Sequence, residues 1–206
     1  MKNLILTIDD APSTHMDKKC AFLLHHSIPA IFYCRGEFIP SKEDSLVKAI
    51  EKGFLIGNHS FSHTSFQKLS FQEIVNEITQ TEELIDRCYQ KADLQRPLKT
   101  IRFPFGEPSQ DKENLHLFLQ AQGFQRLSCS TQPIDTSWTI DTLDYKKKSK
   151  VNLALLEKQL QKNHAPHIVL MHDFSFSHHV FEPTIRFFLQ QGCHFLDAIP
   201  YFENVQ

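Results

Sequence analysis

The sequence lacks a cysteine framework. Its five cysteines are odd in number, widely spaced and free of any C-x-x-C pair: Cys20, Cys34, Cys88, Cys129 and Cys193. Disulfide scaffolds depend on paired cysteines, so this pattern favours reduced thiols. The first apolar run, residues 4–8, follows a single lysine and precedes two aspartates, which is unlike a secretory signal or a membrane helix. A cytoplasmic protein is therefore the expectation.

The sequence also lacks an excess of either charge. It contains 22 Lys and Arg against 24 Asp and Glu, a formal net charge of −2. Surfaces that bind nucleic acids or anionic lipids need a basic face. Positive charge gathers only at Lys146, Lys147, Lys148 and Lys150, in a segment interpreted as a solvated loop. We therefore expect neither a nucleic-acid partner nor a membrane partner.

What the sequence does contain is a regular alternation. Eight apolar runs with strand character separate segments with helical periodicity: residues 4–8, 30–34, 54–56, 100–103, 124–129, 137–140, 168–171 and 194–199. This rhythm predicts a parallel sheet or barrel. A length of 206 residues suits one domain with a sizeable core, and no repeat or linker divides the chain. We predict a single α/β domain over residues 1–206.

Serines and glycines mark the expected helix ends. Ser13, Ser41 and Ser70 are positioned to begin helices, and Ser70 forms a capping box with Glu73. Gly53, Gly123 and Gly192 stand where helices would stop. Three isoleucines, Ile74, Ile78 and Ile85, recur at helical spacing and predict one buried helix face.

Five polar clusters follow predicted strands, and they carry most of the chemistry. They occupy residues 9–10, 59–63, 102–105, 141–145 and 170–172. Because the carboxyl ends of parallel strands open on one face of a sheet, residues far apart in the sequence are expected to meet there.

Two histidines in the second cluster have the spacing of metal ligands. His59 and His63 are four residues apart, so a helical turn would project both imidazoles from one face. With the carboxylate of Asp10 they form a set typical of catalytic zinc. The same donors also form the facial triad of Fe(II) oxygenases, an alternative that leaves Arg102, Asp144 and His172 without a task.

Adjacent aspartates at a strand end need compensation by a cation or a proton. If Asp10 binds a metal, Asp9 can act as a base. The alternative is a polar turn that leads into a helix N-terminus, where aspartates are favoured. Taken alone, Arg102 would similarly be a surface ion pair, His172 a core histidine and Asp144 a turn residue.

These clusters resemble, in order and across essentially the whole chain, the five motifs of the polysaccharide deacetylases, carbohydrate esterase family four. The family's T-F-D-D-G corresponds to residues 7–11 and its H-[ST]-x-x-H to residues 59–63. Its R-x-P-[YF] corresponds to residues 102–105, its D-x-x-D-W to residues 141–145 and its L-x-H to residues 170–172.

The resemblance implies a distorted (β/α) barrel that hydrolyses N-acetyl groups of sugars or oligosaccharides with a divalent metal. It implies that Asp10, His59 and His63 hold this metal, with Zn²⁺ as the first expectation and Co²⁺, Ni²⁺ or Mn²⁺ as alternatives. Asp9 would be the general base, and Arg102 would fix its carboxylate and keep it ionised.

The resemblance also implies an acid and an acyl pocket. His172 would protonate the leaving amine, and Asp144 would raise the pKa of its imidazole. The backbone N–H of Phe105 would hold the oxyanion, while Leu170 and Tyr145 would form an apolar wall for the acetyl methyl group. Trp138 is expected to pack in its strand without a catalytic task.

Three positions depart from the family motifs, and none of them removes a ligand, the base or the acid. Ile8 replaces phenylalanine, Ala11 replaces glycine and Tyr145 replaces tryptophan. We expect Ala11 to restrict the backbone of its loop and Tyr145 to alter the acyl pocket.

The substrate stays open on the sequence alone. A short N-acetylated oligosaccharide is the first expectation. The alternatives are a deacylase or deformylase of a small, non-polymeric amide and a metal-containing binding module without turnover. Four further histidines, His164, His167, His178 and His179, are interpreted as solvated loop residues rather than a second metal site.

Overall fold

The computed structural model describes residues 2–130, 137–146, 150–175 and 178–205. Its strands are β1 (Asn3–Ala11), β2 (Ala30–Cys34), β3 (Leu55–Asn58), β4 (Lys99–Thr100), β5 (Phe124–Leu127), β6 (Ile140–Asp141), β7 (His167–His172), β8 (His194–Phe195) and β9 (Phe202–Asn204). Its α-helices are α1 (Met16–His25), α2 (Glu43–Glu51), α3 (Phe71–Lys91), α4 (Lys112–Ala121), α5 (Leu153–Leu160) and α6 (His178–Gln190). Short 3-10 helices include η1 (Gly36–Ser41), η2 (Phe66–Lys68), η3 (Pro104–Gly106) and η5 (Ile199–Tyr201).

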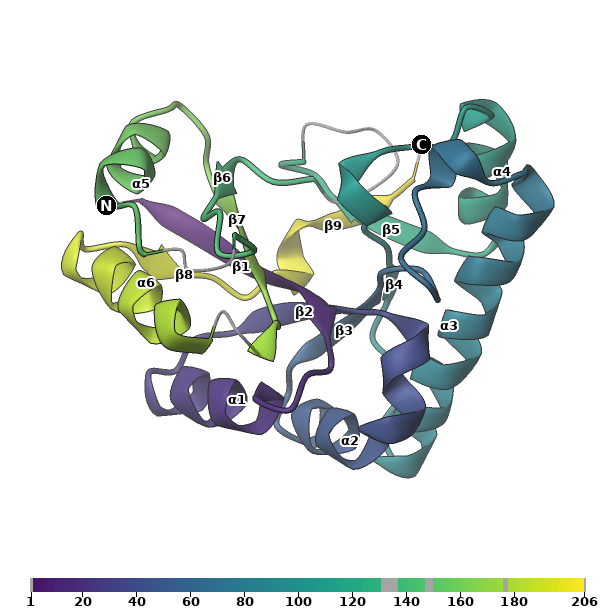
Figure 1. The fold of residues 1–206 in the computed structure, drawn as a ribbon, viewed down its shortest axis with the longest axis horizontal. Coiled ribbons are helices and arrows are strands. Elements are labelled where there is room, and N and C mark those ends of the chain that lie inside the picture. Colours follow the sequence, from purple (N-terminus) through teal and green to yellow (C-terminus); the bar gives the residue numbers. More distant parts are fainter. Residues whose placement is uncertain (1, 131–136, 147–149, 176–177, 206) are drawn as a thin grey trace.

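The strands form a parallel main sheet and a small second sheet. The main sheet has the order β3-β2-β1-β7-β6, and β8 also pairs with β1. The second sheet has the order β4-β5-β9, and a bridge between Asn58 and Ile101 connects it to the end of β3. The helices lie around the strands, from α5 and α6 at the left through α1 and α2 at the bottom to α3 and α4 at the right (Figure 1). The predicted α/β class is confirmed.

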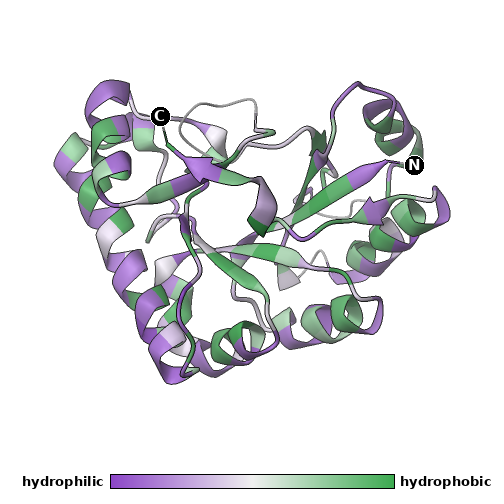
Figure 2. Ribbon diagram, turned by 180° about the vertical axis from the view of Figure 1, so that it is seen from behind, coloured by the Kyte–Doolittle hydropathy of each residue, from purple (hydrophilic) through white to green (hydrophobic). Residues whose placement is uncertain are grey.

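Burial explains why the central strands are apolar along their whole length. Every residue of β2 is buried, as is every residue of β1 after Asn3. A parallel strand covered by helices on its outer face and by the interior on its inner face needs apolar residues on both. Figure 2 shows hydrophobic residues along the central strands and hydrophilic ones on the outer faces of the helices.

The helix boundaries follow the sequence signals in part. The capping box of Ser70 and Glu73 opens α3, and the three isoleucines of this helix are buried, as predicted. The predicted stops are also confirmed, because Gly53, Gly123 and Gly192 follow α2, α4 and α6 with positive φ angles. The predicted starts at Ser13 and Ser41 are wrong, since His15 and Lys42 are the N-cap residues of α1 and α2.

Several strands are shorter than the apolar runs that predicted them. Residues 194–199 form only the two-residue β8 followed by η5, and residues 137–140 contribute only Ile140 to β6. The antiparallel β9 was not expected, because three residues near the chain end give too little periodicity to predict a strand. Lys147 and Lys148 of the lysine run lie outside the described residues, and Lys146 and Lys150 are exposed. Within the described residues, no helix is both long and apolar enough to cross a bilayer.

A buried ion pair connects α1 to the segment after β7. Lys19 Nζ lies 2.8 Å from Asp173 Oδ1, and both side chains are fully buried. Lys19 also donates to the carbonyl oxygen of His172, while the backbone N–H and hydroxyl of Ser13 donate to the two oxygens of Asp173. The pair thereby joins the ends of the two central strands, β1 and β7.

We expect Lys19→Met to lower the free energy of unfolding by about 3 kcal/mol, because removing one partner leaves the buried charge of Asp173 uncompensated. Urea unfolding measures the change. The control is Lys18→Met in the same helix, where the lysine is exposed and the free energy should change little. Equal stability of the two variants would contradict the assignment of a compensating role to Lys19.

Candidate metal centre and active-site cleft

A cleft of about 410 Å³ opens at the carboxyl ends of the parallel strands. It is lined by Asp9, Asp10, His59, His63, Phe105, Gly106, Trp138, Asp141, Tyr145, Leu170, His172 and Phe174. Eight of the ten site residues predicted from the sequence are therefore at its surface. The other two, Arg102 and Asp144, are buried behind it and contact Asp9 and His172.

Three predicted ligands lie close enough together to share a metal ion. One ligand atom from each of Asp10, His59 and His63 lies within 4.8 Å of the others, and this is the only such group of three within the described residues. Asp10 and His59 are buried and His63 is half-buried. The buried Oδ1 of Asp10 accepts no hydrogen bond from a described residue, which is costly for a carboxylate without a cation. The donor set therefore fits a divalent metal.

The histidine pair is not on a helical turn, contrary to the sequence prediction. Residues 59–63 form a bend in which Ser60 and His63 have φ angles of +61°. The imidazole centroids are nonetheless 4.8 Å apart. The irregular backbone of this bend therefore brings the two rings together, and a helical turn is not needed.

Both imidazoles are arranged to offer a lone pair. His59 Nδ1 donates to the carbonyl oxygen of Arg102 at 2.8 Å, which leaves Nε2 as the acceptor that faces the cleft. Burial, together with His59 and Arg35, lowers the pKa of His63 to about 3, so its ring is neutral at physiological pH. Neutral imidazole is the form that binds metals.

Hydrogen bonds from α3 and within the bend hold this backbone in place. Glu77, which sequence reasoning missed, accepts hydrogen bonds from the backbone N–H groups of Phe61 and Ser62 at 2.9 and 2.7 Å. Ser60 Oγ accepts one from the N–H of His63 at 3.0 Å. A glutamate 14 residues after a histidine gives no local signal, because α3 comes beside the bend only in the folded chain.

Asp9 is held as a charged carboxylate beside these ligands. Arg102 Nη1 lies 2.7 Å from Asp9 Oδ1 and also donates to Thr7 Oγ1. Arg102 is fully buried, over the rings of Tyr33 and Trp138, and so is no surface ion pair. Burial raises the pKa of Asp9, but the charges of Arg102, His59 and His172 and the Arg102 hydrogen bond outweigh it and lower the pKa below its usual value.

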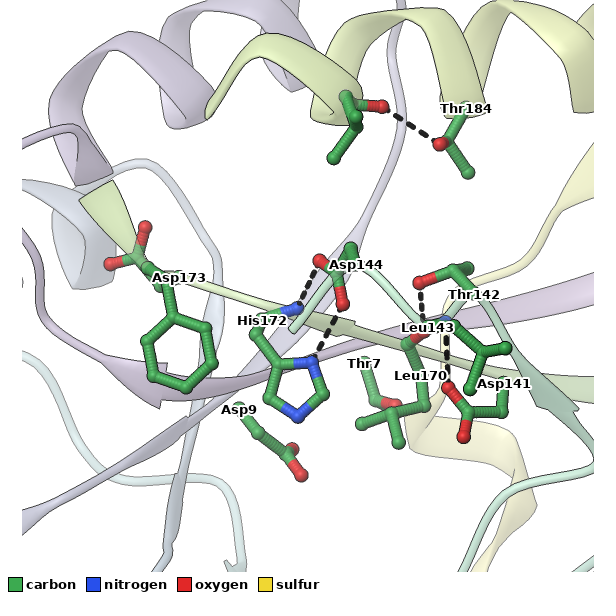
Figure 3. A network of polar contacts seen from close by, with 12 residues as sticks. Thr7, Asp9, Asp141, Thr142, Leu143, Asp144, Leu170, His172, Asp173 and Thr184 are labelled. Carbon is green, nitrogen blue, oxygen red and sulfur yellow. Dashed lines mark hydrogen bonds and ion pairs between the residues drawn. The ribbon is translucent and has the colours of Figure 1, made fainter. Parts of the chain in front are cut away.

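His172 and Asp144 form a second hydrogen-bonded pair. Asp144 Oδ1 lies 2.7 Å from His172 Nδ1, and Oδ2 accepts from the backbone N–H of His172 at 2.8 Å. Figure 3 shows both contacts and the other edge of the imidazole turned toward Asp9. Burial lowers the pKa of His172, but the hydrogen bond and charge of Asp144, with Asp9 and Asp10, raise it above its usual value.

Aromatic side chains form much of the remaining wall. Tyr145 contacts the His172 imidazole edge-on, and Phe174 stacks nearly parallel on the same imidazole with ring centroids 5.2 Å apart. The ring of Phe105 contacts His63 at 4.6 Å and is 61% exposed, so its side chain, and not only its backbone, faces the cleft. Leu170 is buried at the base.

Trp138 also belongs to this wall, although it was expected only to pack in its strand. Its ring lies over Arg102 and against Gly106, where an added Cβ would lie 2.7 Å from the indole. Gly106 has a φ of +68°, so this position requires glycine for its backbone and for its neighbour. An aromatic residue beside a short strand is usually core, which is why the sequence did not identify it.

In the part of the chain that the structure describes, the four histidines that were expected to be solvated loop residues do not form a second metal site: His164, His167, His178 and His179. His167 is buried in β7, where burial lowers its pKa to about 4, so the expectation of a solvated loop residue is wrong for it. The expectation of a loop is also wrong for His178 and His179, which begin α6; His178 stacks on His15 with ring centroids 4.6 Å apart. None of the four joins a group of three metal-binding side chains within the described residues.

This arrangement combines a metal-binding set, an ionised carboxylate and a histidine with a raised pKa around one cleft. Such a set can activate water, stabilise an oxyanion and protonate a leaving group. It is typical of metal-assisted hydrolysis.

Comparison with known proteins identifies relatives of this chain. A family model for polysaccharide deacetylase matches residues 1–123. A peptidoglycan-N-acetylglucosamine deacetylase of Bacillus cereus is 30% identical over 142 residues, which are 68% of this chain and 46% of that protein. The chain thus spans about half the length of this curated relative.

Solved structures share the fold. The Bc1960 peptidoglycan N-acetylglucosamine deacetylase superposes with a TM-score of 0.75 at 23% identity, over 99% of this chain and 90% of that one. BA3943 of Bacillus anthracis, a family-four pseudoenzyme, superposes with a TM-score of 0.71 at 22% identity, over 93% of this chain and 62% of that one. The family and fold expected from the sequence are confirmed: the chain belongs to the polysaccharide deacetylases, carbohydrate esterase family four.

Proposed function

We propose that residues 1–206 form one catalytic domain that removes acetyl groups from N-acetylated sugars or oligosaccharides with the help of a divalent metal. The observation that carries this proposal is the convergence on one cleft of the Asp10, His59 and His63 group with two buried pairs, Asp9–Arg102 and Asp144–His172. A cytoplasmic location stays a prediction from the sequence.

Asp10, His59 and His63 would hold the metal, with zinc as the first expectation. When bound, zinc polarises a carbonyl group and lowers the pKa of water to about 7, which supplies a nucleophile at neutral pH. The two buried pairs have no task in an oxygenase, so they favour hydrolysis over the iron alternative.

The side chains of this chain supply the proton transfers. Asp9, held ionised by Arg102, accepts a proton from the attacking water. The backbone N–H of Phe105 donates to the oxygen of the substrate carbonyl as negative charge develops there. His172, whose pKa Asp144 raises, donates its Nε2 proton to the departing nitrogen, because an amide anion is too poor a leaving group to depart unprotonated. Leu170 and Tyr145 pack against the acetyl methyl group.

Acetate release tests this proposal. Zinc-loaded protein is incubated with a panel of N-acetylated oligosaccharides and small amides, and acetate, formate and free amine are measured. Acetate from N-acetylglucosamine oligomers supports the proposal. Activity only on small amides would replace the sugar substrate with the deacylase alternative, and ligand binding without any release would make the chain a binding module.

We expect Asp9→Asn to lower kcat by about 10² to 10⁴, because an amide cannot accept the proton of the attacking water. Initial rates of acetate release measure the loss. Asp17→Asn changes an exposed aspartate in the first turn of α1 and is the control. A kcat within a few-fold of the unaltered protein would remove Asp9 from the role of base.

We expect Glu77→Gln to weaken zinc binding by about 10- to 100-fold, the usual effect of losing a group that orients metal ligands. The neutral amide oxygen is a weaker acceptor for the N–H groups of Phe61 and Ser62 than the carboxylate. Competition with a chelating dye gives the dissociation constant. Glu83→Gln, an exposed position of the same helix, should bind zinc normally. If both variants bind alike, the bend does not depend on Glu77.

We expect Asp144→Asn to move the alkaline limb of the kcat/KM profile to lower pH. His172 is an acid only below its pKa, and Asp144 raises that pKa. Without the carboxylate the imidazole loses its proton at lower pH, so activity falls earlier as the pH rises. Acetate release is measured between about pH 5 and 10, a range that extends to both sides of the reference pKa of histidine, about 6.5. An unmoved limb would assign the acid to another group.

A further inference from the structure

Asp141 is a carboxylate of the cleft that none of the proton transfers uses. It ends β6 and lines the cleft with Leu170 and His172. It is half-buried, and burial raises the pKa of its carboxyl group. No ion pair to it is found in the described parts of the chain, whereas Asp9 and Asp144 each have a charged partner. A carboxylate without such a partner in a partly apolar cleft needs a reason.

The position of Asp141 is fixed on both sides. Its backbone N–H donates to Gln159 Oε1 at 2.8 Å, and Gln159 Nε2 donates back to its carbonyl oxygen at 3.0 Å. Its Oδ1 accepts from the N–H of Leu143 at 2.8 Å. The helix α5 thus holds the strand end through one glutamine, and the turn holds the carboxylate in one orientation.

The sheet register places this carboxylate beside the acyl pocket. Asp141 pairs with Leu170 of β7, and Leu170 pairs with Thr7 of β1. Paired residues of parallel strands point to the same face and stand about 4.8 Å apart. Figure 3 shows the Asp141 carboxylate and the His172 imidazole on the same side of β7, with Leu170 between them. If the acetyl methyl group of a bound sugar packs against Leu170, the hydroxyl groups of that sugar ring would therefore lie within reach of Asp141.

We propose that Asp141 is a specificity-determining residue that accepts hydrogen bonds from hydroxyl groups of the substrate sugar. This proposal rests on the proposed function, and it assigns to Asp141 the discrimination between sugar substrates and simple amides. An ionised carboxylate accepts strongly from hydroxyls, and a site built to bond a hydroxyl discriminates against analogues that lack it. Small amides without hydroxyl groups leave this carboxylate without a partner.

The competing explanation is that Asp141 only stabilises its turn, since an aspartate that accepts from the N–H two residues on is a common turn element. Asp141→Asn separates the two roles. Asparagine keeps an oxygen for the N–H of Leu143 but replaces the outward carboxylate oxygen with a donor. A turn residue tolerates this change, whereas an acceptor for hydroxyl groups does not.

The first test measures binding without turnover. Tri-N-acetylchitotriose is titrated into zinc-loaded protein carrying Asp9→Asn, with and without Asp141→Asn, in a calorimeter. We expect the added substitution to raise Kd by about tenfold. The matched control is Asp197→Asn, because Asp197 Oδ1 accepts from the N–H of Ile199 at 3.0 Å in the same kind of turn, exposed and outside the cleft. This control should bind as tightly as its parent.

The second test uses the active protein. With Asp141→Asn alone, we expect KM for the trisaccharide to rise about tenfold while kcat stays within about threefold, and the ratio of kcat/KM for the trisaccharide to that for acetamide to fall. Unchanged Kd and KM, equal losses on both substrates, or no binding of the trisaccharide by the parent would overturn the inference. Binding that depends on Asp141 without acetate release would support it and refute the hydrolase proposal instead.

Discussion

The parallel pairing of β1 with β7 is the constraint on which the rest of the site depends. Its register sets Asp9 opposite His172 and Thr7 opposite Leu170. The proposed base and acid are thereby neighbours across one ladder, although Asp9 lies near the start of the sequence and His172 in its last fifth. A slip of either strand by one residue would turn its side chain to the other face of the sheet. The pair Lys19–Asp173 holds the ends of the same two strands together just beyond these residues.

Compensation of buried charge is the second organising feature. Asp9, Asp10, Asp144, Arg102, Lys19 and Asp173 are all buried at or beside the carboxyl end of the sheet. Five of them are arranged in pairs with one another or with His172. Among the residues that the structure describes, the basic groups nearest to Asp10 are distant, with Arg35 at 3.6 Å and His63 at 3.8 Å. An uncompensated buried carboxylate is costly. The Asp10 carboxylate, which lies in the group with His59 and His63, therefore favours a bound cation.

The sequence predicted the parts of this site that depend on strand ends. The clusters at Asp9, Arg102 and His172 each follow an apolar run, and the geometry of parallel sheets brings such ends together whatever lies between them. The bend at residues 59–63 could not be predicted from the sequence. Its backbone is left-handed at Ser60 and His63, and Glu77 of helix α3 holds it in place. Trp138 and β9 escaped prediction for a related reason: an isolated aromatic residue and a three-residue strand acquire meaning only from distant neighbours.

The departures from the family motifs fall where the structure tolerates them. Glycine would matter at position 11 if the backbone there were left-handed, but the positive φ of this segment, +60°, belongs to Asp10, a residue type that adopts it more readily than most. Ala11 therefore does not restrict its loop in the way expected from the sequence. Tyr145 is 40% exposed and meets the edge of His172 with ring centroids 5.4 Å apart. Its change from tryptophan alters the rim of the cleft, while the buried pairs Asp9–Arg102 and Asp144–His172 are in place.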